Sequence, residues 1–141
     1  FSSPTAIRVL KKHDAVHMKK HDVTCLKYLF LAGEPLDEPT ARWASDSLGV
    51  AIVDNYWQTE TGWPILSAQP GVEDTRRKFG SPSFPVYGYN VKLKDEITGK
   101  ETGPDEKGVL CVVPPLPPGA MDVRGSRSRT APGPVDDEEL E

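Results

Sequence analysis

Apolar residues in the first half of the chain fall into two short runs separated by a helical pattern. The first run, Cys25 to Ala32, is apolar except for one lysine and is followed by Gly33-Glu34-Pro35. A run of this length that ends in turn residues predicts a central parallel strand buried on both faces. The second run, Val50 to Val53, predicts the next short strand.

A helix is predicted between these two strands. Asp37 can cap its first turn and Gly49 can end it. Ala41, Ala44 and Leu48 recur between them at helical spacing. The order strand, loop, helix, strand makes a parallel βαβ unit, so the predicted fold class is α/β.

Patterns elsewhere divide the chain into four segments. Ser3 and Pro4 predict a helix start, and the polar stretch 11–21 predicts a second short helix or a loop. Short apolar or alternating runs at 91–94 and 109–113 predict a small antiparallel sheet. We therefore expect residues 1–69 to form part of an α/β subdomain, 70–77 a connector, and 78–113 part of a small β-subdomain. Residues 114–141 would be a proline-rich connector and a disordered tail, because every aromatic residue precedes Asn90.

Composition narrows the function classes. The chain has 17 lysines and arginines against 21 aspartates and glutamates, which gives a formal net charge of −4. This balance argues against a general nucleic-acid or anionic-membrane binder. Cys25 and Cys111 lie far apart, so we expect two reduced thiols buried as small apolar residues in a cytoplasmic protein.

Candidate chemistry is concentrated where the two predicted strands end. Ligands of open parallel sheets bind at the carboxyl ends of the strands, so Gly33-Glu34-Pro35 and residues 54–62 should lie together. Residues 54–62 read Asp-Asn-Tyr-Trp-Gln-Thr-Glu-Thr-Gly. Aromatic faces can stack on a base, polar groups can contact its edge and phosphates, and a carboxylate suits Mg²⁺. Composition alone leaves a nucleotide-binding loop and a structural turn equally open.

An ordered set of motifs carries a resemblance to a known family. The motifs are Ser3-Pro4-Thr5-Ala6-Ile7-Arg8, Ala32-Gly33-Glu34-Pro35-Leu36, Asp54 through Ile65, and Tyr87-Gly88-Tyr89-Asn90-Val91. Over about Phe1 to Gly119 they resemble the AMP-forming short-chain acyl-CoA synthetases of the adenylating superfamily. The resemblance implies an internal fragment of the large N-terminal adenylating domain, with residues 1–69 in its nucleotide-binding subdomain.

The resemblance also implies how ATP and AMP would bind. Gly33, Glu34 and Pro35 would line the adenosine part of ATP. Residues 54–59 would form the main ATP/AMP-binding loop, which consists of Asp54, Asn55, Tyr56, Trp57, Gln58 and Thr59. Within it, Tyr56 would lie against adenine, and Asp54 and Asn55 would lie near the edge of the base.

Catalytic roles are implied for the last residue of this loop and for the residue that follows it. Thr59 would contact the α-phosphate, and Glu60 would help to hold Mg²⁺. Trp57 resembles the tryptophan that closes the acyl pocket, where an indole leaves room for two or three carbons.

The implied reaction has two halves. A short-chain carboxylate, with propionate favoured and acetate next, attacks the α-phosphorus of ATP to form an acyl-AMP, and coenzyme A then takes the acyl group. Catalysis would rest on positioning and on charge stabilisation, without a protein nucleophile. The family's phosphate loop should lie upstream, and its ribose-binding aspartate and catalytic lysine downstream. We therefore expect the fragment alone to be inactive.

Three alternatives stay open at this point. Ala120 to Glu141 departs from the family pattern, so the chain could be a truncated, non-catalytic product. Pro114 to Pro118 has PxxP spacing, which is typical of a proline-motif interaction protein as well as of a stiff connector. His13, His17 and His21 could bind a metal if they shared one continuous helix, whereas a solvated lysine-rich face needs no metal. Protein partners cannot be predicted.

Overall fold

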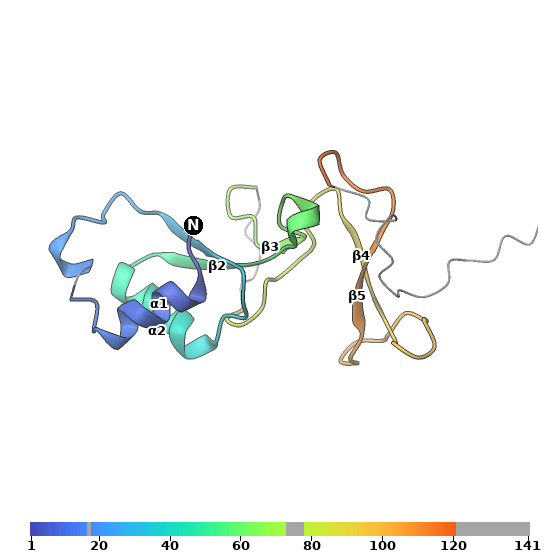
Figure 1. Cartoon of the computed structure of the whole chain (residues 1–141), viewed down its shortest axis with the longest axis horizontal. Helices are drawn as coiled ribbons and strands as arrows, with labels where there is room; N and C mark the ends of the chain where they lie inside the picture. The colour runs from blue at the N-terminus through green and yellow to red at the C-terminus, as the bar shows by residue number, and fades with distance from the viewer. Residues whose placement is uncertain (17, 73–77, 121–141) are drawn as a thin grey trace, which may run out of the picture.

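The computed structural model describes residues 1–16, 18–72 and 78–120. Its first part contains helices and a three-stranded sheet, and its second part contains a two-stranded sheet (Figure 1). The two parts are joined by apolar contacts between side chains of both sheets.

The three-stranded sheet is built around a parallel pair of strands. β1 (Tyr28–Leu31) and β2 (Ala51–Tyr56) pair with Tyr28 opposite Ala51 and Leu31 opposite Asp54. The helix α2 (Glu38–Leu48) connects them, which confirms the predicted βαβ unit. β3 (Leu66–Ser67) then pairs antiparallel with the end of β2, an element that the sequence analysis did not predict.

Both long helices begin at the predicted capping residues. At the start of α1 (Pro4–Lys12), Ser3 Oγ accepts a hydrogen bond from the Ala6 N–H at 3.3 Å. At the start of α2, Asp37 Oδ1 accepts from the Thr40 N–H at 2.9 Å. Gly49 ends α2 with a φ of 68°, a left-handed conformation that glycine adopts at little cost.

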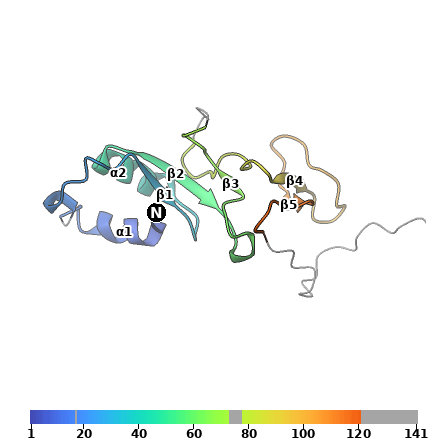
Figure 2. The same ribbon diagram turned by 90° about the horizontal axis from the view of Figure 1, so that it is seen from above.

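The main core lies between these helices and the parallel strands. Figure 2 shows α1 and α2 side by side next to the sheet, and residues of both helices belong to one buried apolar cluster. The buried members are Ile7, Leu29, Leu31, Leu36, Ala41, Ala44, Val50 and Ile52. This packing fixes where β1 and β2 end, and hence where the candidate site lies.

The first strand is shorter and less buried than predicted. Leu29 and Leu31 face the core, whereas Tyr28 is exposed. Beyond β1, the described residues extend the sheet only by a parallel bridge between Ser2 and Leu31. The prediction of a central strand buried on both faces is therefore wrong here, because only the face toward the helices is covered. The prediction for Cys25 is also wrong, since that free thiol is exposed.

The second part of the chain agrees with the predicted antiparallel sheet. β4 (Asn90–Lys94) pairs with β5 (Val109–Val113), with Asn90 opposite Val113. A second apolar cluster joins this sheet to the first. Its members are Ile65, Val86 and Tyr89, packed against Tyr56, Leu66, Val91 and Val112. Through this cluster the end of β2 is held by both sheets.

The described residues do not support a metal site formed by histidines on one continuous helix. Helix α1 ends at Lys12, with His13 as its C-cap, and His21 follows the short 3₁₀ helix η1 (Met18–Lys20). His13 and His21 therefore do not share one continuous helix, and His17 lies outside the described residues. Among the side chains that the structure places, no three His, Cys, Asp or Glu groups gather as a metal site.

Several other predictions remain without a structural test. Residues 73–77 of the predicted connector and 121–141 of the predicted tail lie outside the described residues, and the segment boundaries stay predictions. Pro117 lies against Gly88, whose added Cβ would be 3.2 Å from the proline Cβ, so this part of the PxxP stretch packs on its own chain. In the part of the chain that the structure describes, no helix is long and apolar enough to cross a membrane.

The Asp37 cap leads to a prediction about stability and pH. Hydrogen bonding to Thr40 and the nearby Arg8 guanidinium hold the pKa of Asp37 at about 2, below its ordinary value of 3.8. A carboxyl whose pKa is lowered on folding stabilises the fold above its ordinary pKa and loses that effect as pH falls through about 2.

We expect Asp37→Asn, which keeps a capping side chain, to lower the free energy of unfolding at pH 7 by less than about 1 kcal/mol. The loss is small because the ion pair between Asp37 and Arg8 is exposed. The difference from the unsubstituted chain should shrink between pH 4 and pH 2. Urea unfolding across that range measures it, and a gap independent of pH would contradict the assignment.

Candidate functional site

The segments that follow β1 and end β2 line one cleft of about 380 Å³. Gly80 and Pro82, from the second half of the chain, complete its wall. The first segment contributes Gly33, Glu34, Pro35 and Leu36, and the second contributes Asp54, Asn55, Tyr56 and Trp57. This shared cleft confirms the prediction that the ends of the two strands lie close together.

The second segment differs in conformation from the predicted loop. Asp54, Asn55 and Tyr56 belong to β2, because β3 pairs with Asn55 and Tyr56 and prolongs the strand. The prediction of a loop starting at Asp54 is therefore wrong by three residues. A strand places alternate side chains on opposite faces, so neighbouring residues here have different environments.

Asp54 and Tyr56 supply the accessible polar groups of this strand end. Asp54 is half-buried, and burial raises the pKa of its carboxyl. The Tyr56 hydroxyl accepts a hydrogen bond from Gln58 Nε2 at 2.9 Å, and its ring packs on the second apolar cluster. The tyrosine is thus fixed at both ends while it borders the cleft.

Asn55 has a structural role that the sequence analysis missed. The side chain is buried, and its Nδ2 donates to the carbonyl oxygens of Leu31 at 3.1 Å and Val53 at 2.9 Å. Its Oδ1 accepts from the Ser67 hydroxyl at 2.6 Å. The amide therefore ties together the ends of β1, β2 and β3, with each polar atom engaged inside the protein.

Ser67→Ala tests this buried network. The substitution leaves Asn55 Oδ1 buried without its donor, which typically costs about 1–3 kcal/mol. We expect a corresponding loss in the free energy of unfolding by urea, with Ser47→Ala on the exposed face of α2 as the control. Equal stability of the two variants would show that the network contributes nothing.

Residues 58–60 lie beyond the cleft. After β2 the chain forms the short 3₁₀ helix η2 (Thr59–Thr61), ended by Gly62 at a φ of 64°. The Thr61 hydroxyl donates to the Gln58 carbonyl at 2.8 Å and fixes the turn. Gln58 and Thr59 are exposed and Glu60 is half-buried, and none of the three lines the cleft. The structure thus gathers seven of the predicted site residues there and leaves these three at its end.

Trp57 borders two hollows at once. It lines the cleft and also an apolar cavity of about 600 Å³ on the other side. Its ring lies 5.9 Å from that of Phe1, which stacks on Phe30 at 6.5 Å. The indole therefore borders the cleft and the apolar cavity at once.

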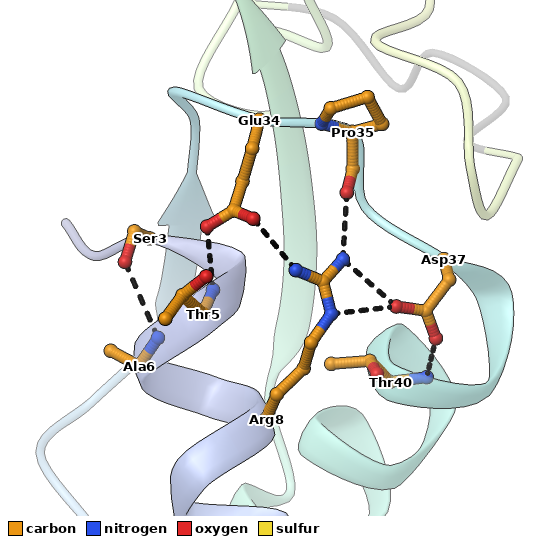
Figure 3. Close-up of polar contacts among 8 residues, drawn as sticks. All are labelled: Ser3, Thr5, Ala6, Arg8, Glu34, Pro35, Asp37 and Thr40. Atoms are coloured by element: carbon orange, nitrogen blue, oxygen red, sulfur yellow. Dashed lines mark hydrogen bonds and ion pairs between the residues drawn. The ribbon is translucent and has the colours of Figure 1, made fainter.

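Arg8 holds the segment after β1, a role that the sequence analysis also missed. Figure 3 shows its guanidinium between Glu34, Pro35 and Asp37. It donates to Glu34 Oε2 at 2.7 Å from Nη1, to the Pro35 carbonyl at 2.8 Å from Nη2 and to Asp37 Oδ2 at 3.1 Å from Nε. The sequence pointed to Arg8 only through its place in the first family motif, residues 3–8, four residues after the predicted helix start at Pro4.

Glu34 is therefore held by protein groups on both sides. Its Oε1 accepts from the Thr5 N–H at 2.8 Å, in the first turn of α1. Bonding to Thr5 and to Arg8 lowers the pKa of the Glu34 carboxyl. Glu34 lines the cleft, as predicted, while both carboxylate oxygens point to helix α1 (Figure 3).

Comparisons with known proteins show the family of the chain. The sequence model of the family described as AMP-binding enzyme matches residues 1–116. The propionate–CoA ligase of Escherichia coli (strain K12) is 56% identical over 121 residues, which cover 86% of this chain and 19% of the ligase. The acetyl-coenzyme A synthetase of Cryptosporidium parvum is 42% identical over 115 residues, which cover 79% of this chain and 16% of that protein.

A solved structure extends the likeness to the fold. The anthranilate CoA ligase AuaEII, crystallised in complex with anthranoyl-AMP, matches with a TM-score of 0.68 and 27% identity, over 79% of this chain and 20% of that chain. The fold is that of part of the N-terminal domain of adenylating enzymes. The chain spans about a fifth of the length of the curated relatives that it matches. It belongs to the family of AMP-binding enzymes.

Proposed function

We propose that the protein that carries this chain is an AMP-forming short-chain acyl-CoA synthetase, with propionate as the favoured substrate and acetate next. The observation that carries the proposal is the cleft between Gly33–Pro35 and Asp54–Trp57, at the carboxyl ends of two parallel strands. Family membership and the names of relatives, a propionate–CoA ligase and an acetyl-coenzyme A synthetase, support the reaction class.

The cleft would hold the adenosine part of ATP and of the acyl-AMP. Tyr56 would lie against the adenine ring, because its own ring is fixed by the Gln58 bond and by the second cluster. Asp54 would lie near the edge of the base, and Gly33, Glu34 and Pro35 would form the facing wall. Asn55 would contribute by shaping the strand end, since its side-chain amide is bonded within the protein.

Trp57 would close the acyl pocket. Its indole borders both the cleft and the apolar cavity, so an acyl group joined to AMP would reach it from the cleft. A large ring at this point leaves room for few carbons, which favours propionate and acetate over longer acids.

Gln58, Thr59 and Glu60 would face the phosphates. They follow the cleft along the chain, and the Thr59 hydroxyl and the Glu60 carboxylate remain free of side-chain hydrogen bonds to described residues. A single half-buried carboxylate fits Mg²⁺, which commonly uses one or two protein carboxylates together with substrate phosphates. Bound there, Mg²⁺ would neutralise phosphate charge.

Catalysis by this chain's residues would be positioning. They would bind ATP, orient its α-phosphate toward the carboxylate and exclude water from the acyl group. Coenzyme A would then accept the acyl group without a protein nucleophile. We expect the 141 residues alone to be inactive, because they span about a fifth of the related enzymes. The exposed free thiol of Cys25 favours a reducing, cytoplasmic setting.

Carboxylate-dependent exchange of labelled pyrophosphate into ATP tests the proposal in the intact protein. We expect exchange with propionate, weaker exchange with acetate, and none without a carboxylate. AMP formation should then require coenzyme A. Absence of exchange with every short-chain acid would favour the truncated, non-catalytic product instead.

A further inference from the structure

The cluster around Arg8 links helix α1 to residues that follow 26 to 29 positions later in the chain. Arg8 lies in α1, Glu34 and Pro35 in the segment after β1, and Asp37 at the cap of α2 (Figure 3). We call the four residues the Arg8 cluster. Its Nη1 reaches Glu34 and its Nη2 reaches the Pro35 carbonyl, while Nε donates to Asp37 Oδ2 at 3.1 Å.

The residues that these contacts hold, 33–35, lie between two buried residues, Ala32 and Leu36. Gly33 has a φ of 97°, a conformation that favours glycine, and residues 32–37 form no helix or strand. Gly33, Glu34 and Pro35 line the cleft, so their position defines that wall. Without Arg8, residues 33–35 would lose contacts between these two buried ends, and a ligand would have to order them on binding.

Arg8 itself does not line the cleft. Its donors are directed at protein acceptors, and the carboxylate oxygens of Glu34 accept from Arg8 and from Thr5. Arg8 therefore acts on the cleft through residues 33–35, and its effect on a nucleotide bound there would be indirect.

We propose that Arg8 is a positioning residue for nucleotide binding, which presets the Gly33–Pro35 wall of the adenosine site. The inference rests on the proposed function, because the ligand of the cleft is taken to be ATP. A preset wall spares ATP the cost of ordering it, so loss of Arg8 should weaken ATP binding specifically.

The geometry requires an arginine. One planar guanidinium reaches a carboxylate, a carbonyl oxygen and a second carboxylate at the same time. A lysine ammonium is a single point charge and can satisfy only part of this set. Arg8→Lys should therefore restore little of what Arg8→Met removes.

Steady-state kinetics of the intact protein test the proposal. We expect Arg8→Met to raise the KM for ATP about tenfold, with the KM for propionate within about twofold and kcat little changed. Hydrogen exchange should become faster in peptides covering residues 33–36 and stay unchanged in β4 and β5. Lys92→Met is the matched control, since it removes a cation paired with Glu101 far from the cleft.

The outcomes separate the two proposals. If the unsubstituted protein shows no exchange activity with ATP, the proposed function fails. If it is active and Arg8→Met leaves the KM for ATP unchanged, the positioning role alone is wrong. Equal increases in the KM values for ATP and for propionate, with faster hydrogen exchange throughout the chain, would also overturn the positioning role. Such a result would indicate a general loss of stability.

Discussion

Replacing Glu60 with alanine is expected to lower the rate of pyrophosphate exchange by roughly 10²–10³-fold, the usual effect of removing one group that stabilises charge in a transition state. Glu60 stands on η2, four residues after Tyr56, where the phosphates of a nucleotide in the cleft would lie. Its half-buried carboxylate would hold Mg²⁺ against those phosphates.

Initial rates at saturating and limiting Mg²⁺ measure this effect. The loss should be deeper at limiting Mg²⁺, because the substituted protein would hold the cation more weakly. Glu96→Ala removes an exposed carboxylate from the turn after β4 and serves as the control. Near-normal rates for Glu60→Ala at limiting Mg²⁺ would remove Glu60 from the metal site.

Replacing Trp57 with glycine is expected to move substrate preference to longer acids. The indole lines both the cleft and an apolar cavity of about 600 Å³, so its removal is expected to join the two. Each methylene buried in the opened space contributes about 0.8 kcal/mol, or roughly fourfold in affinity. The ratio of kcat/KM for hexanoate to that for propionate should therefore rise by more than about tenfold.

Trp63→Gly provides a matched comparison. Trp63 also lines the apolar cavity, but it is 65% exposed and does not border the cleft. Removing it takes away the same side chain without opening a passage, so the substrate ratio should stay close to its original value. A fixed profile in Trp57→Gly, or the same shift in both variants, would contradict the pocket assignment.

The parallel unit of the fold could be predicted because its signals are local. Caps such as Ser3 and Asp37, and the terminating Gly49, act through hydrogen bonds within a few residues. The burial of β1 could not be predicted in the same way, because an apolar run does not reveal what covers the second face of the strand. β3 is only a two-residue pairing, so it left no periodic pattern to detect.

The candidate site, too, has features that could be predicted and features that could not. The meeting of Gly33–Pro35 with Asp54–Trp57 follows from parallel topology and was predicted. The buried role of Asn55 depends on Ser67, twelve residues away, and the Arg8 contacts span 26 to 29 residues. Such long-range partners have no signature in a single sequence, and the same residue types would suit direct ligand contacts equally well.

Photolabelling of the intact protein with 2-azido-ATP tests the adenosine cleft most directly. If the cleft binds adenosine, the label should attach within residues 54–57 or 33–36, and both unlabelled ATP and AMP should prevent it. Attachment elsewhere in the protein that ATP prevents, with these two segments unlabelled, would contradict the assignment of this cleft.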